Sequence, residues 1–170
     1  MTASRVGGRY DEAMLAPMSE PEYAEYIERS VARYAEALAR AGVMDVAAAL
    51  QSARTHMEAL LPDGRLTTGH HFMNLVRGGD VVGTLWFHEQ LDESPPRLFV
   101  FDVRVRPESQ GAGVGTAAME ALEAEARRSG VSQLMLSVFF HNAGAIRLYE
   151  RLGFEECERS EAGMRMRKSV

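Results

Sequence analysis

The sequence is poor in cysteine: Cys157 is the only one among 170 residues. A single thiol cannot form a disulfide within the chain and suits a reducing compartment. Cys157 stands among glutamates, in Glu155-Glu156-Cys157-Glu158, and neighbouring carboxylates disfavour the thiolate that acts as a nucleophile. We therefore expect an inert cysteine.

Long apolar runs and basic stripes are also missing. No stretch approaches the roughly 18 apolar residues of a membrane-spanning helix, and residues 1–10 are polar and contain glycine, unlike a signal peptide. The chain has 19 Lys and Arg against 24 Asp and Glu, a net charge of −5, which disfavours nucleic acid as a partner. We expect a cytoplasmic protein that binds neither membrane nor nucleic acid.

A metal-ligand pattern is absent as well. His70 and His71 are adjacent, so in a strand their side chains point to opposite faces. No cysteine or second histidine follows at the spacing that zinc sites use. We expect no metal site. We expect His88 and His141 to be surface histidines, with a position lining a substrate cleft as the alternative.

The chain is organised around residues 98–130. Residues 98–105 (LFVFDVRV) are rich in β-branched and aromatic side chains, which predicts a strand that Pro107 ends. The glycine-rich segment 110–115 (QGAGVG) follows, and a helical pattern then runs from Val114 to a stop near Gly130. Such a turn brings several backbone N–H groups to the positive end of a helix, which suits an anion such as a pyrophosphate. The alternative is a tight turn that only packs the helix.

Two well-known phosphate-binding motifs fit this segment poorly. The P-loop requires Gly-Lys-Ser/Thr, and no lysine lies between residues 97 and 167. The dinucleotide fingerprint is formally matched by Gly113, Gly115 and Ala118, but its first glycine should follow the strand directly. It also expects an acidic residue at the end of the next strand, where residues 138–140 read Val-Phe-Phe.

The segment resembles the acetyl-CoA loop of the GNAT superfamily of N-acetyltransferases, which has the form Gln/Arg-x-x-Gly-x-Gly/Ala. Gln110, Gly113 and Gly115 match it, after a strand that ends Val-x-Pro (105–107). The downstream run Asn142-x-x-Ala145-x-x-Leu148-Tyr149, followed by Gly153-Phe154, resembles the second cofactor motif of the same family. Short segments such as Leu61-Pro62-Asp63-Gly64, His70-His71 and Gly83-Thr84-Leu85-Trp86 look like an uncharacterised bacterial subgroup of it.

The resemblance implies an α+β, GNAT-like fold. It implies a mixed, mostly antiparallel central sheet of about six to seven strands, flanked by about four helices, with a splayed parallel strand pair that binds CoA. We expect a single acetyltransferase domain over residues 1–170, with residues 1–10 as a loose N-terminus.

The hydrophobic pattern of the first half predicts its elements. A short strand is expected within residues 13–18, and the pair Ser19 and Glu22 predicts a capping box that opens a long helix. Asp45 caps a second helix, which we expect to bury Leu50, Ala53, Met57 and Leu60. Residues 71–76 and 81–87 read as a hairpin.

The resemblance also assigns the site. The cosubstrate is acetyl-CoA, with no metal. The residues that it assigns to CoA binding are Val103, Arg104, Val105, Gln110, Gly111, Ala112, Gly113, Val114, Gly115, Thr116, Asn142, Ala145 and Tyr149. Pantetheine would bond to the backbone of residues 103–105, and an N–H near Val103 would polarise the thioester carbonyl.

Two side chains are expected to carry the chemistry. By resemblance, the hydroxyl of Tyr149 protonates the leaving sulfur. Asp102 is the one carboxylate inside the cofactor strand, and it either accepts the amine proton through water or binds the cationic acceptor; purely structural pairing with an arginine is the alternative. The preceding position, acidic in some relatives, is Phe101 here.

These features predict an N-acetyltransferase that moves an acetyl group from acetyl-CoA to a primary amine of a small molecule or protein, by direct transfer in a ternary complex. The alternatives are a non-catalytic acetyl-CoA-binding regulator on the same fold and a dinucleotide-dependent oxidoreductase. The expected partner is a small-molecule or peptide amine, and a homodimer is possible.

Overall fold

The computed structural model describes residues 14–170, so the expected loose terminus at residues 1–10 lies outside the described residues. The elements in chain order are β1 (Met14–Pro17), α1 (Glu20–Arg40), α2 (Val46–Leu60), η1 (Gly64–Leu66), β2 (His70–Arg77), β3 (Asp80–Gln90), β4 (Arg97–Val105), η2 (Pro107–Ser109), α3 (Val114–Arg128), β5 (Gln133–Phe139), α4 (Ala143–Arg151), β6 (Glu155–Arg159) and β7 (Gly163–Ser169).

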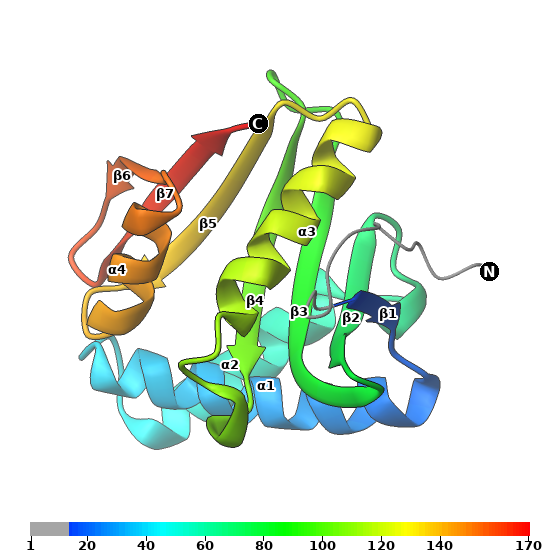
Figure 1. The fold of residues 1–170 in the computed structure, drawn as a ribbon. Coiled ribbons are helices and arrows are strands. Elements are labelled where there is room, and N and C mark those ends of the chain that lie inside the picture. Colours follow the sequence, from blue (N-terminus) through cyan, green and yellow to red (C-terminus); the bar gives the residue numbers. More distant parts are fainter. Residues whose placement is uncertain (1–13) are drawn as a thin grey trace. The chain divides into compact units, whose positions relative to one another are not determined.

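The strands form one seven-stranded sheet in the order β1-β2-β3-β4-β5-β7-β6 (Figure 1). The pairs β1–β2, β2–β3 and β3–β4 are antiparallel, and β4–β5 is parallel. The expected α+β fold with a mostly antiparallel sheet is therefore confirmed.

The described chain separates into two compact units. The first comprises residues up to 18, residues 69–136 and residues 167–170; the second comprises residues 19–68 and 137–166. The assignment of one domain to residues 1–170 stays a prediction.

In the first unit, α3 packs on a sheet formed by β1 to β4 and the start of β5 (Figure 1). Ala118, Met119 and Leu122 of α3 are fully buried, as are Leu75 and Leu85 of the strands. Helix and sheet therefore share one apolar core, which holds the beginning of α3 at the end of β4.

A β-bulge interrupts β4 in the middle of this sheet. Trp86 lies opposite Asp102 and Phe87 lies opposite Val100, so Phe101 is the extra residue. A bulge increases the local twist of its strand. The half of β4 that follows, which the sequence assigns to the cofactor, is thereby turned relative to the half that precedes it.

The second unit contains the helical hairpin α1–α2. The capping box of Ser19 and Glu22 is present, because the Ser19 N–H donates to Glu22 Oε2 at 2.7 Å and the Glu22 N–H donates to Ser19 Oγ at 3.4 Å. Asp45 caps α2 as predicted. The predicted burial of Leu50 is wrong, since 42% of it is exposed and Ala49 lies in the core instead.

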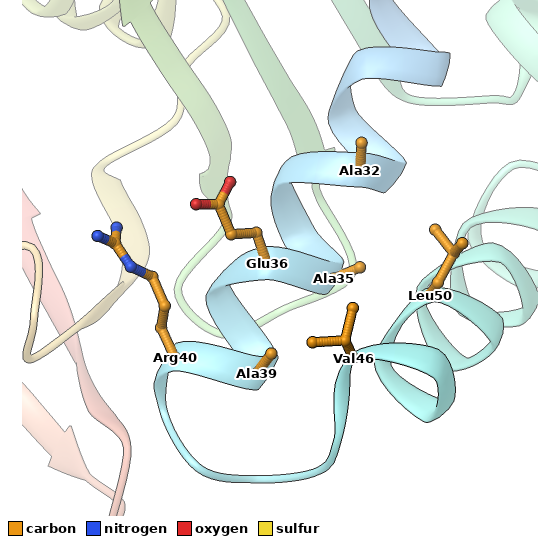
Figure 2. A pocket seen from close by; sticks show the side chains of 7 residues that line it. All are labelled: Ala32, Ala35, Glu36, Ala39, Arg40, Val46 and Leu50. Atoms are coloured by element: carbon orange, nitrogen blue, oxygen red, sulfur yellow. The ribbon is translucent and has the colours of Figure 1, made fainter.

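An apolar groove of about 440 Å³ lies between α1 and α2. Its lining residues are Ala32, Ala35, Glu36, Ala39, Arg40, Val46 and Leu50. Figure 2 shows Glu36 and Arg40 projecting from α1 away from α2, while the aliphatic side chains face one another. The groove is therefore lined mainly by aliphatic side chains, and its one acid and one base are directed away from α2.

Candidate active site

The glycine-rich loop joins β4 to α3. Gly111 has φ 75° and Gly113 has φ 76°, a left-handed conformation that favours glycine. A Cβ atom at either position would meet no other atom within 4 Å. Glycine is therefore required here by the backbone conformation, and the space in front of the loop is open.

The first turn of α3 presents unused donors to that space. Gly113 is the N-cap and supplies no capping side chain, and the first ladder bond runs from the Ala117 N–H to the Gly113 carbonyl. The N–H groups of Val114, Gly115 and Thr116 precede this bond and have no acceptor within the helix. Together with the helix dipole, these N–H groups provide the donors on which the predicted anion site depends.

Two hydrogen bonds hold the loop in place. Gln110 Nε2 donates to the Val105 carbonyl at 3.2 Å, which ties the loop to the end of β4. Arg77 Nη1 donates to the Ala112 carbonyl at 3.0 Å. Sequence reasoning assigns Gln110 to the cofactor and misses Arg77 altogether, because no local pattern relates residues 35 positions apart.

One edge of the second half of β4 is turned away from β3. The Arg106 N–H donates to the Val82 carbonyl at 2.8 Å, and the register continues with Arg104 opposite Thr84 and Asp102 opposite Trp86. In an antiparallel ladder, hydrogen-bonded and non-hydrogen-bonded pairs alternate. The backbone N–H and C=O groups of Val103 and Val105 therefore point away from β3. The parallel pairing between β4 and β5 ends at Val100 and Leu136, before it reaches these residues.

Asp102 lies on this half of β4 with 23% of its side chain exposed. Its Oδ1 is 3.5 Å from Nε of the exposed Arg104, so the pairing with an arginine that the sequence left open is present. An ion pair with an exposed partner is worth little free energy. The contact therefore does not commit Asp102 to a structural role.

A histidine and aromatic cluster lies on the same part of the sheet. His70 Nδ1 accepts a hydrogen bond from Trp86 Nε1 at 3.0 Å, and the His70 ring stacks on His88 with 4.0 Å between centroids. The Trp86 ring stacks on Phe101 at 4.5 Å. Burial lowers the pKa of His70 to about 4, and the neighbouring His88 and His71 add to the effect. His70 is 8% exposed, and His88, which is expected at the surface, is half-buried.

The second motif lies on α4, in the second unit. Asn142 is the N-cap of α4, and its Oδ1 accepts the Ala145 N–H at 3.4 Å. Tyr149 is the buried residue of this helix, 8% exposed, and its ring centroid is 5.7 Å from that of Phe154. The motif residues thus cap the helix and anchor Tyr149 beside Phe154.

His141 and Cys157 both lie at the surface, as the sequence predicts for the histidine. His141 is exposed and stacks on Phe139, and the exposed Cys157 donates from Sγ to the Arg165 carbonyl at 3.6 Å. Within residues 14–170, no group of three or more His, Cys, Asp or Glu could hold a metal ion. None of the helices in this part of the chain is long and apolar enough to cross a membrane.

Comparison with known proteins identifies the family. The model of the acetyltransferase (GNAT) family matches residues 34–154, which is more than half of the chain. The chain belongs to the GNAT family. The dinucleotide-dependent alternative is thereby set aside.

Two relatives illustrate the relationship. The uncharacterised N-acetyltransferase YycN of Bacillus subtilis is 34% identical over 146 residues, which cover 85% of this chain and 94% of YycN. Its crystal structure superposes with a TM-score of 0.83 at 33% identity, over 87% of this chain and 95% of that one. The ribosomal protein bS18-alanine N-acetyltransferase of Escherichia coli K12 is 37% identical over 90 residues, 52% of this chain and 58% of the relative.

A more distant structure shows the same fold. The PaiA N-acetyltransferase of Thermoplasma acidophilum, solved in complex with coenzyme A, has a TM-score of 0.67 at 15% identity. The match covers 93% of this GNAT protein and 99% of PaiA.

Proposed function

We propose that this GNAT protein is an acetyl-CoA-dependent N-acetyltransferase that acetylates a primary amine of a small molecule or protein by direct transfer in a ternary complex. The observation that carries the proposal is the loop at Gly111–Gly113, which is open in front and followed by three N–H groups without acceptors in α3. The presence of CoA in PaiA, a protein of the same fold, supports this choice of cosubstrate.

The substrate would be held by backbone groups. The pyrophosphate accepts hydrogen bonds from the start of α3, where the dipole adds a partial positive charge. The pantetheine arm pairs with the outward-facing backbone of Val103 and Val105 on β4. The Val103 N–H then donates to the thioester carbonyl and stabilises the oxyanion that forms when the amine attacks.

The reaction needs three proton transfers, two from the nitrogen and one to the sulfur. The acceptor ammonium loses a proton, either to Asp102 through water or to solvent while Asp102 binds the cation. The neutral nitrogen attacks the acetyl carbon, and the C–S bond breaks as the tetrahedral intermediate collapses. Tyr149 donates its phenolic proton to the departing sulfur, so that CoA leaves as a thiol, and the nitrogen of the new amide loses its second proton through water to the Tyr149 phenolate.

The first test of this proposal is calorimetric titration with acetyl-CoA and, separately, with NAD, followed by a screen of amines. Polyamines, amino acids and peptides are the first acceptors. Peptides with N-terminal alanine are included because the E. coli relative is named for that residue of bS18. Saturable binding of acetyl-CoA with turnover of one amine class supports the enzyme. Binding without turnover of any amine supports the non-catalytic regulator.

The second test replaces Tyr149 with phenylalanine, which removes the hydroxyl and keeps the ring against Phe154. We expect kcat to fall by about 10² or more, since general acid catalysis contributes about that much, while the Kd for acetyl-CoA stays within about twofold. Tyr34→Phe is the matched control, because Tyr34 lies on α1 beside His56. Equal turnover in both variants would remove Tyr149 as the acid.

A further inference from the structure

Arg77 reaches the glycine-rich loop from another strand. It is the last residue of β2 and precedes a turn of two glycines, Gly78 and Gly79, both with positive φ. Because β3 is antiparallel to both β2 and β4, these two strands run in the same direction, and their C-terminal ends lie on the same side of the sheet. The helix α3 also begins on this side (Figure 1).

The contact of Arg77 determines the direction of a peptide group. Arg77 Nη1 donates to the Ala112 carbonyl at 3.0 Å. In a trans peptide, the carbonyl and the following N–H point in opposite directions. The N–H of Gly113 therefore points away from Arg77. The loop is open at Gly113, because a Cβ atom added there would meet no atom within 4 Å.

We propose that Arg77 is a positioning residue for the pyrophosphate-binding loop, which holds the Ala112–Gly113 peptide with its N–H directed at the anion. This inference rests on the proposed function, because it assumes that the loop binds the pyrophosphate of acetyl-CoA. Nothing in the two sequence motifs includes residue 77.

The chemistry of the arginine suits this role. A guanidinium is permanently charged and donates from a rigid planar group. Its hydrogen bond polarises the peptide that it holds, from the carbonyl side opposite the Gly113 N–H. The two arginines that flank the loop in sequence differ: Arg104 contacts Asp102, and Arg106 uses its backbone N–H to pair with Val82.

The test compares two ligands that differ in the pyrophosphate and the 3′-phosphoadenosine attached to it. Acetyl-CoA contains both groups, and S-acetylpantetheine has the same thioester arm without them. Wild type, Arg77→Met and Arg77→Lys are titrated calorimetrically with both ligands. Arg128→Met is the matched control, because Arg128 lies at the other end of α3, about 20 Å away for a helix of this length.

We expect Arg77→Met to weaken acetyl-CoA binding about tenfold or more, as is typical for the loss of a charged hydrogen bond. Binding of S-acetylpantetheine should change less than about twofold, and Arg77→Lys should be intermediate for acetyl-CoA. Arg128→Met should match wild type with both ligands.

Other outcomes overturn the inference. Equal losses for both ligands would show that Arg77 supports the fold in general, and thermal unfolding of each variant reports that effect separately. Unchanged affinity for acetyl-CoA in Arg77→Met would show that the contact is dispensable. Failure of wild type to bind acetyl-CoA at all would remove the proposed function, and this inference with it.

Discussion

At the scale of single residues, His70 shows how neighbours set the chemistry of a side chain. Its Nδ1 accepts the Trp86 N–H, so the neutral ring carries its proton on Nε2. Protonation at Nδ1 would break that bond and place a cation against the stacked ring of His88. His70 is therefore held neutral and serves as a rigid platform for His88 and Trp86.

This neutrality predicts a pH dependence of stability. The folded-state pKa of His70 is lowered from 6.5 to about 4, so between these values the unfolded chain binds a proton that the folded chain does not. The free energy of unfolding should then rise from about pH 4 to about pH 6.5 and level off above, because stability increases with pH where the unfolded state holds more protons. Urea unfolding followed by the fluorescence of Trp86, the single tryptophan, measures it.

The control for this prediction is His70→Asn, which keeps an acceptor for the Trp86 N–H but does not titrate. Its stability should show a smaller slope over the same pH range. If wild type and variant have the same slope, groups other than His70 carry the pH dependence.

At the scale of elements, α3 has a left-handed glycine at each end. Gly113 is its N-cap with φ 76°, and Gly130 follows its C-cap with φ 71°. At Gly130 the Val131 N–H donates to the Ala126 carbonyl, which closes the helix in a Schellman motif. A Cβ at either glycine would meet no atom within 4 Å, so the two positions differ in helix polarity but not in crowding.

This symmetry gives a matched pair of substitutions, Gly113→Asp and Gly130→Asp. Both introduce a side chain at positive φ, at a cost of about 1 kcal/mol. A carboxylate near a helix N-terminus recovers about 0.3–1 kcal/mol, and one near the C-terminus loses a similar amount. We expect Gly113→Asp to be the more stable variant in chemical denaturation.

Acetyl-CoA binding should show the opposite order. The carboxylate at position 113 would stand at the N–H groups that we propose for the pyrophosphate, so we expect a loss of about tenfold or more in affinity. Gly130→Asp should bind like wild type in the same calorimetric titration. A normal affinity of Gly113→Asp would show that the loop only packs the helix.

At the scale of the whole molecule, ligand binding and unfolding are coupled. A ligand that binds only the folded chain stabilises it by about 2.7 kcal/mol at a concentration of 100 times its Kd. For a chain of 170 residues, each kcal/mol raises Tm by about 2–4 °C. Stability measured with and without a ligand therefore reports which ligand the folded protein recognises.

We accordingly expect saturating acetyl-CoA to raise Tm by roughly 5–10 °C in a thermal shift experiment. NAD at the same concentration should leave Tm unchanged, because the loop after β4 lacks the features of a dinucleotide site. An equal shift with both nucleotides would indicate a general anion effect. Inorganic pyrophosphate at matched ionic strength serves as the control for that effect.

Much of the site region was predictable because its signals are local. Pro107 ends the cofactor strand near Val105, the glycines require left-handed backbone, and the capping box of Ser19 and Glu22 begins α1 as expected. Each of these signals acts within a few residues, through steric limits on φ or a hydrogen bond to a nearby N–H. The prediction for Leu50 was wrong because a helical pattern alone does not say which side of α2 meets α1.

The amino-acid sequence by itself determined the main helices and strands from β1 to α3, the glycine loop, the two motifs and, through them, the family. Only the tertiary structure decided that the bulge at Phe101 turns the second half of β4, that Val103 and Val105 face away from β3, and that Arg77 holds Ala112. The physical reason is range. Propensity and capping act between neighbours in the chain, whereas strand register, buried pairs such as His70 and Trp86, and contacts across 35 residues exist only after the chain has packed.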